Sequence, residues 1–85
     1  MTHWVYVLRC GDQSLYTGYT TDVARRVATH QVGRGARYTR GRGTLVLVAA
    51  WGYADKRAAL RAEARFKRLK RPQKLAWLGD NAGPP

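Results

Sequence analysis

The first twenty residues constrain the fold more than any other part of the chain. Residues 4–8 and 14–19 are rich in β-branched and aromatic side chains, which favour extended strands. Between them, residues 10–13 contain Gly11 and Asp12, two residue types that are common in tight turns. We therefore predict an antiparallel β-hairpin at the start of the chain.

The remaining residues predict one further strand and three helices. Helices are expected at residues 23–31, 56–70 and 73–78, because apolar side chains recur at helical spacing and capping residues or Pro72 precede them. The nearly continuous apolar run of residues 45–53 predicts the central strand, buried on both faces. The order β-β-α-β-α-α predicts an α/β (α+β) sandwich, with a small mixed or antiparallel three-stranded sheet flanked by helices.

The chain of 85 residues is short enough for a single domain, which we place at residues 1–78. Residues 79–85 are polar and rich in Gly and Pro, so they predict a loose, flexible C-terminal tail. Residues 33–43 contain four glycines and four arginines and predict a flexible basic loop.

Positive charge is the outlying feature of the composition. Sixteen Lys and Arg oppose five Asp and Glu, which gives a formal net charge of +11. Such a domain attracts polyanions, and 12 of the 16 are Arg, whose planar fork binds phosphate at two points. The charge therefore predicts a nucleic-acid partner but says nothing about catalysis. A ribosome-associated or merely adhesive basic protein has the same composition.

The cysteine content and the apolar runs indicate a cytoplasmic protein that does not enter a membrane. Cys10 is the only cysteine, so no internal disulfide can form, which fits a reducing compartment. A lone cysteine beside a strand is more often a core residue than a nucleophile. The N-terminus lacks the pattern of a signal peptide, and the longest apolar run is too short to cross a bilayer.

Glu63 is the only glutamate and the only acidic residue without an ordinary structural role. The four aspartates fall in a turn, at two helix caps and in the tail. On a helical wheel, Glu63 flanks the apolar stripe of the second helix, which consists of Ala59, Ala62, Phe66 and Leu69. A carboxylate there can hold a divalent cation, because Mg²⁺ often takes one or two protein carboxylates plus water and phosphate. The alternative is an i,i+4 salt bridge to Lys67.

Arg26 and His30 lie four residues apart on the side of the first helix that also carries Val23 and Val27, whereas Arg25 points the opposite way. Such a pair can clamp a phosphate and position or move a proton. The alternative is a hydrogen-bonded interfacial histidine beside an arginine whose stem packs on the core.

Tyrosines form a further group with two interpretations. Tyr6 and Tyr16 fall on paired strands, where they can share one face of the sheet. Phenol groups can orient a water or a phosphate, although tyrosines on a sheet more often only pack.

Together, the order and spacing of these residues resemble the GIY-YIG nuclease superfamily. The resemblance covers about residues 3–78 and rests on residues 5–7, residues 16–18, Arg26, His30 and Glu63. Its small standalone bacterial members also carry a stretch like residues 36–39. The sequence departs from the pattern in its first motif, which lacks the glycine, and in its second, which has Thr17 at the middle position.

The resemblance implies a metal-dependent endonuclease that hydrolyses phosphodiester bonds, in DNA rather than RNA, with a role in DNA repair or recombination. The implied catalytic residues are Tyr6, Tyr16, Arg26, His30 and Glu63, and Gly18 is the implied structural glycine of the second motif. Glu63 would bind a single Mg²⁺ (or Mn²⁺) ion, and Arg26 would stabilise charge in the transition state. Tyr6 would orient or deprotonate the attacking water, with Tyr16 or His30 as its partner.

Two basic surfaces would grip the nucleic acid in this interpretation. They comprise the loop residues Arg34, Arg37, Tyr38, Arg40 and Arg42 and the helix residues Arg57, Arg61, Arg65 and Arg68. Backbone contacts carry no sequence information, so we expect little specificity unless a partner protein supplies it. We expect a monomer or weak dimer. The alternatives are a non-catalytic nucleic-acid-binding module of the same fold and an adaptor with an exposed apolar patch that includes Trp51 or Trp77.

Overall fold

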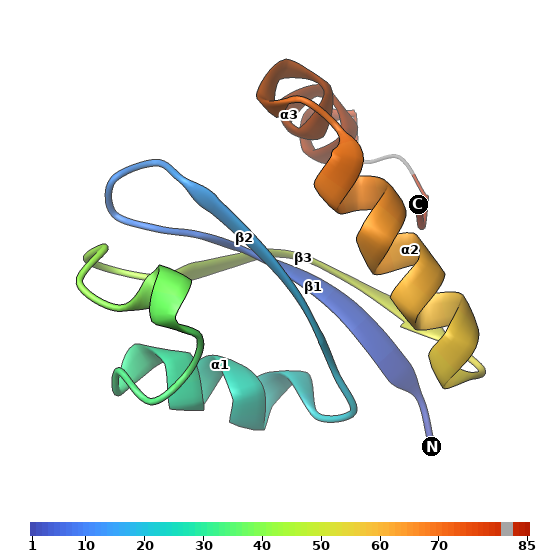
Figure 1. Cartoon of the computed structure of the whole chain (residues 1–85), viewed down its shortest axis with the longest axis horizontal. Coiled ribbons are helices and arrows are strands. Elements are labelled where there is room, and N and C mark those ends of the chain that lie inside the picture. The colour runs from blue at the N-terminus through green and yellow to red at the C-terminus, as the bar shows by residue number, and fades with distance from the viewer. Residues whose placement is uncertain (81–82) are drawn as a thin grey trace.

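The computed structural model describes residues 1–80 and 83–85. Its strands are β1 (His3–Arg9), β2 (Leu15–Thr20) and β3 (Val46–Tyr53), and its helices are α1 (Val23–Gln31), α2 (Lys56–Arg68) and α3 (Arg71–Gly79) (Figure 1). A 3₁₀ turn, η1 (Arg37–Thr39), interrupts the glycine-rich loop before β3. The predicted fold class and the order β-β-α-β-α-α are confirmed, and the sheet is antiparallel throughout.

β1 is the central strand, because the strand order is β2-β1-β3. The prediction that residues 45–53 form the central strand is therefore wrong. β3 lies at the edge of the sheet, and its Val46 and Leu47 side chains are 41% and 43% exposed. An apolar run identifies a strand but does not say which strands it pairs with. The continuous burial expected of a two-sided strand is found instead at residues 5–8 of β1, all 0% exposed.

The two faces of β1 pack against two different helices. Tyr6 and Leu8 point to one face, where Cys10 is also buried and Val27 of α1 packs against them. Val5 points to the other face and packs against α2. The two helices accordingly lie on opposite sides of the sheet (Figure 1). Because strand side chains alternate, each position of β1 is committed to one layer.

The helix starts follow from their caps. The Asp22 side chain accepts a hydrogen bond from the backbone N–H of Arg25 (3.1 Å), and Asp55 accepts one from that of Ala58 (2.8 Å). Pro72 lies in the first turn of α3, where its missing N–H has no helical partner to lose. No helix within the described residues is long and apolar enough to span a membrane.

The end of the chain returns to the helices. The Trp77 indole N–H donates to the carbonyl of Gly83 (2.9 Å), and the Arg65 guanidinium donates to that of Pro85 (2.9 and 3.2 Å). Residues 81–82 of the expected tail lie outside the described residues. The division into a domain and a loose tail therefore stays a prediction.

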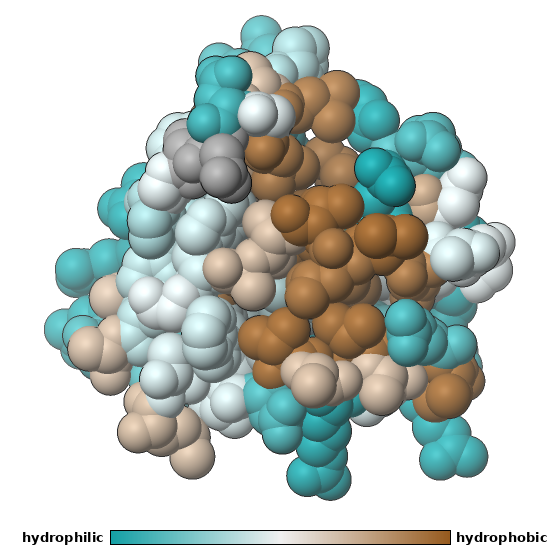
Figure 2. Space-filling view, turned by 180° about the vertical axis from the view of Figure 1, so that it is seen from behind, coloured by the Kyte–Doolittle hydropathy of each residue, from teal (hydrophilic) through white to brown (hydrophobic). Residues whose placement is uncertain are grey.

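Hydrophobic side chains also gather on the face opposite to the one seen in Figure 1, as Figure 2 shows. The two tryptophans proposed for an apolar patch are only half-buried. The Trp51 ring lies 5.4 Å, between centroids, from the ring of Phe66 in the layer beneath α2, so Trp51 serves mainly as a packing residue.

Phe66 anchors α2 to the sheet, and its removal should test this packing. Phe66 is 0% exposed, whereas Leu60 on the same helix is 41% exposed. We expect Phe66→Ala to lower the free energy of unfolding by about 3–5 kcal/mol, because it leaves a cavity. Leu60→Ala should change it by less than about 1 kcal/mol. Urea unfolding followed by circular dichroism measures both, and equal effects would contradict the proposed packing.

Candidate active site

The site is built around a buried hydrogen bond between the central strand and α1. The Tyr6 hydroxyl lies 2.8 Å from Nε2 of His30. Tyr6 is 0% and His30 2% exposed, so neither group can turn to water for a replacement bond. Tyr6 projects from the α1 face of β1, and His30 lies in the last turn of α1. The sequence prediction that His30 lies on the buried side of its helix is confirmed.

The other ring nitrogen of His30 is held by the turn that follows α1. His30 Nδ1 lies 3.0 Å from the Thr39 hydroxyl oxygen and 3.3 Å from the backbone nitrogen of Ala36. If Nδ1 is unprotonated, it accepts from the Ala36 N–H, and Nε2–H donates to Tyr6. If Nδ1 is protonated, it donates to the Thr39 hydroxyl, and Nε2 accepts from Tyr6. Each neutral tautomer thus has partners, which is the condition for passing a proton through the ring.

Two further tyrosines, Tyr16 and Tyr38, lie beside this pair. The Tyr16 ring centroid lies 5.1 Å from that of His30 and 6.2 Å from that of Tyr6, so the two strand tyrosines share one face as predicted. Tyr38, which is 41% exposed, lies 5.7 Å from Tyr16 and forms the outer end of the row. Tyr6 is thus the innermost of the three, and the half-buried Tyr16 lies between it and the surface.

Two glycines leave room for these rings. A Cβ on Gly18 would lie 2.6 Å from the Tyr6 hydroxyl oxygen and 3.0 Å from a Tyr16 ring carbon. A Cβ on Gly35 would overlap Nδ1 of His30. The sequence predicted a role for Gly18 but none for Gly35, Ala36 or Thr39 individually. Their only signal was their place in the glycine-rich loop and in the stretch of residues 36–39.

Arg26 sets the charge of the cluster. Arg26 is half-buried and Arg25 exposed, as the helical wheel predicted. Burial raises the pKa of Tyr6 to about 12, against the lowering effect of Arg26 and with a further increase from Tyr16. Burial, and then the Arg26 charge, lower the pKa of His30 from its ordinary value. At neutral pH, Tyr6 therefore keeps its proton and His30 is uncharged, so His30 can accept a proton from Tyr6.

Glu63 lies on α2 and forms a salt bridge within that helix. Its carboxylate is 2.9 Å from the Lys67 ammonium, so the salt bridge that sequence analysis offered as the alternative is present. α2 packs against the Val5 face of the sheet, opposite to the face of Tyr6. Within residues 1–80 and 83–85, no group of three metal-binding side chains is found. A single Mg²⁺ ion needs no more than one carboxylate beside water and phosphate, so Glu63, whose side chain is 16% exposed, still fits such an ion.

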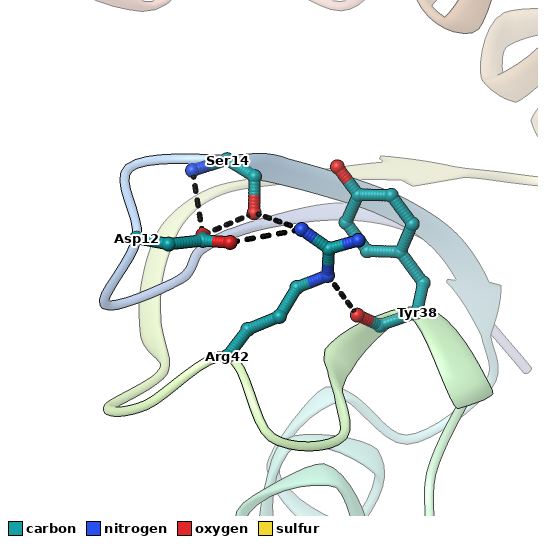
Figure 3. A network of polar contacts seen from close by, with 4 residues as sticks. All are labelled: Asp12, Ser14, Tyr38 and Arg42. Carbon is teal, nitrogen blue, oxygen red and sulfur yellow. Dashed lines mark hydrogen bonds and ion pairs between the residues drawn. The ribbon is translucent and has the colours of Figure 1, made fainter.

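Among the predicted nucleic-acid-binding residues, Tyr38 is exposed and stacks against Arg42, and the arginines divide into two groups. Arg42 pairs with Asp12 at 2.8 Å (Figure 3), while Arg40 and Arg65 donate hydrogen bonds to backbone carbonyls. The others make no side-chain hydrogen bond or ion pair with any described residue, and all are exposed: Arg34, Arg37, Arg57, Arg61 and Arg68. The second group is therefore free to meet phosphate.

Comparison with known proteins assigns the family. Residues 2–76 match the GIY-YIG catalytic domain. The chain belongs to the GIY-YIG family. A GIY-YIG catalytic domain points to a nuclease, with nucleic acid as its substrate, so the resemblance inferred from the motif spacing is confirmed at this level.

Relatives resemble the chain over most of its length. The UPF0213 protein BH0048 of Halalkalibacterium halodurans is 50% identical over 84 residues, which are 99% of this chain and 89% of that protein. The UPF0213 protein spr1390 of Streptococcus pneumoniae is 54% identical over 78 residues, 92% of this chain and 79% of that protein.

Two solved structures share the fold. The solution NMR structure of BH0048 matches with a TM-score of 0.64, covering 99% of this chain and 89% of that one. The solution NMR structure of EF2693 from E. faecalis is 40% identical and matches with a TM-score of 0.66, covering 94% and 85% of the two chains.

Adding a side chain at Gly18 should disrupt the cluster. The methyl group of Gly18→Ala must displace the Tyr6 hydroxyl, and overpacking of this kind costs about 1–3 kcal/mol of unfolding free energy. Gly79→Ala is the matched control, because its Cβ meets nothing within 4 Å. Urea unfolding gives the free energies, and the NMR signals of the His30 ring report the hydrogen bond. Wild-type values for both measurements in Gly18→Ala would contradict this geometry.

His30 should also make stability depend on pH. Its folded pKa lies below the ordinary 6.5, so on acidification the unfolded chain binds a proton there before the folded protein does. The free energy of unfolding should therefore fall as the pH drops below about 6.5 toward the folded pKa. Urea unfolding across this range should show the slope in the wild type and a flatter one in His30→Gln. An unchanged slope in the variant would assign the effect to another group.

Proposed function

We propose that the chain is a metal-dependent endonuclease that hydrolyses phosphodiester bonds in DNA with little sequence specificity. The observation that carries the proposal is the buried hydrogen bond between Tyr6 and a neutral His30, with Arg26 beside both. A structural tyrosine needs only a hydrogen-bond partner. This one has a partner that can also take its proton, and a cation that favours the phenolate.

The buried position of Tyr6 decides which phenol would contact the attacking water and which would transfer a proton to His30. Tyr6 is 0% exposed, so the half-buried Tyr16 is the phenol that meets the attacking water. A proton leaving the water passes to the Tyr16 oxygen, the Tyr16 proton passes to the Tyr6 oxygen, and the Tyr6 proton moves to Nε2 of His30. The water oxygen bonds to phosphorus, and the P–O bond to the leaving nucleotide breaks. Thr39 receives the Nδ1 hydrogen bond in the tautomer that accepts this proton.

Arg26 would stabilise the phosphate as charge builds on it. Its guanidinium lies on the α1 side of the cluster, near enough to Tyr6 and His30 to shift the pKa of each. A half-buried arginine interacts more strongly with a developing negative charge than an exposed one does. The exposed Arg25, one residue earlier on the same helix, lacks this position.

Glu63 is the residue that would hold a single Mg²⁺ or Mn²⁺ ion. When bound, the ion would supply Lewis-acid stabilisation of a phosphate oxygen. Lys67 now neutralises the carboxylate, but its own side chain is 52% exposed and can move into solvent. The exposed arginines of the loop and of α2 would hold the nucleic-acid backbone without reading bases. DNA repair or recombination is the role that such an activity fits.

A cleavage assay with paired variants tests the proposal. Duplex, single-stranded, flap and branched DNA, and RNA, are incubated with Mg²⁺, Mn²⁺ or EDTA. Wild-type protein should cut a DNA substrate only with metal. Arg26→Ala should lower kcat about 10²–10³-fold, whereas Arg25→Ala, with the same loss of charge, should keep kcat within about threefold. Glu63→Gln should abolish metal-dependent cutting and keep salt-sensitive binding.

The alternative is a non-catalytic nucleic-acid-binding module of the same fold. The exposed arginines favour binding whether or not the cluster is active. Salt-sensitive binding without cutting under any metal would establish this alternative and remove the enzyme proposal.

A further inference from the structure

Arg42 joins the β1–β2 hairpin to the turn η1 through its hydrogen bonds. Its Nη1 donates to Asp12 (2.8 Å) and to the hydroxyl of Ser14 (3.5 Å), and its Nε donates to the carbonyl of Tyr38. The guanidinium carbon also lies 4.1 Å from the centre of the Tyr38 ring. Figure 3 shows the group held between the β1–β2 hairpin and the turn η1. Nε and Nη1 are therefore engaged and the ring covers one face of the guanidinium, which leaves the N–H groups of Nη2 for any further partner.

Asp12 is prepared for this contact by its own hairpin. Its second carboxylate oxygen accepts from the backbone N–H of Ser14 (3.0 Å) and from the Ser14 hydroxyl (2.5 Å). These bonds, and then Arg42, hold the pKa of Asp12 below its ordinary value, so the carboxylate stays charged. The backbones also meet closely here, because a Cβ on Gly11 would lie 3.0 Å from the carbonyl oxygen of Arg42.

The segment that Arg42 ties down is the one that reaches the active-site cluster. Tyr38, whose carbonyl and ring Arg42 contacts, lies beside Tyr16. The next residue, Thr39, together with Ala36, holds Nδ1 of His30. A shift of η1 would therefore change two things together: the packing of the Tyr38 ring on Tyr16 and the hydrogen bonding of His30.

We propose that Asp12 and Arg42 are positioning residues, whose ion pair fixes η1 against the hairpin so that Tyr38 covers Tyr16 and Thr39 orients His30. Arg42 thus serves the site from within the fold, in contrast to its predicted role in gripping nucleic acid. The catalytic consequence rests on the proposed nuclease function, whereas the positioning itself does not.

The exposure of the pair separates local from global effects. The Arg42 and Asp12 side chains are 37% and 45% exposed, so their attraction is screened by solvent and adds little to the stability of the whole fold. The ion pair therefore affects mainly how well ordered one loop is, because a surface loop opens more easily than the sheet. Variants of the pair should therefore fold normally and differ in the site.

The first experiment measures the geometry directly. NMR of wild type, Asp12→Ala, Arg42→Ala and the double variant follows the contact between the Tyr38 and Tyr16 rings and the signals of the His30 ring. Both single variants should lose the ring contact and shift the His30 signals, and the double variant should show no further change. Arg34→Ala is the control, because it removes the same charge from the same loop at a residue with no side-chain bond among the described residues. It should leave these signals as in the wild type.

Asp12→Asn is a milder variant to use in case Asp12→Ala fails to fold. It keeps the hydrogen bonds to Ser14 and removes the charge that Arg42 pairs with. Asp12→Asn should reproduce the NMR changes of Asp12→Ala in part while unfolding at the wild-type urea concentration.

The second experiment measures the catalytic consequence on the DNA substrate cut best. Arg42→Ala and Asp12→Ala should lower kcat about tenfold to hundredfold with little change in KM, because small displacements of reacting groups have effects of this size. Arg34→Ala should instead raise KM or weaken binding, with kcat retained.

The outcomes separate the two proposals. Ring contacts and His30 signals that stay unchanged in both single variants would overturn the positioning proposal, whatever the activity. Loss of these signals in the pair variants supports it even if the wild-type protein cuts no nucleic acid, and in that case the nuclease proposal alone falls.

Discussion

The hydrogen bond between Tyr6 and His30 is the constraint on which the surrounding structure depends. It joins the central strand to α1 through two buried polar groups, and leaving either one unpaired costs about 1–3 kcal/mol. The two rings also fill the space beside Gly18 and Gly35, where a Cβ would overlap them. Two distant glycines, one strand register and one turn are thus all fitted to this single contact.

The hairpin register is what brings these parts into one place. In the β1–β2 ladder, Tyr6 lies opposite Gly18, and Leu8 lies opposite Tyr16. A slip of one residue would turn Tyr6 toward α2 and away from His30, because strand side chains alternate between faces. The turn at residues 10–13 therefore matters for the site as well as for the fold. Asp12 belongs to that turn, so one short segment sets the register and also supplies the carboxylate that meets Arg42.

The sequence predicted local features well and long-range partners poorly. Helical periodicity separated Arg26 from Arg25, and strand alternation placed Tyr6 with Tyr16, since both patterns depend only on residues nearby in the chain. The edge position of β3 was missed because an apolar run carries no information about which strand it pairs with. The partners of His30 were missed for a related reason. Thr39 and the backbone of Ala36 approach it through the path of a glycine-rich loop, which no periodicity describes.

Charge explains how one basic chain can order its own loops and still present cations to a polyanion. Five acidic residues cannot pair with sixteen basic ones, so the position of each acid decides which cations are paired within the protein. Asp12 pairs with Arg42, and Glu63 pairs with Lys67. The second pairing differs from the first, because Glu63 is more buried than Asp12 and its lysine is the more exposed partner. An ammonium as exposed as that of Lys67 is a cation that a divalent ion can replace at small cost. The Glu63 carboxylate can therefore pair with Lys67 when no metal ion is bound and hold the ion when one is. The salt bridge does not argue against the proposed metal site.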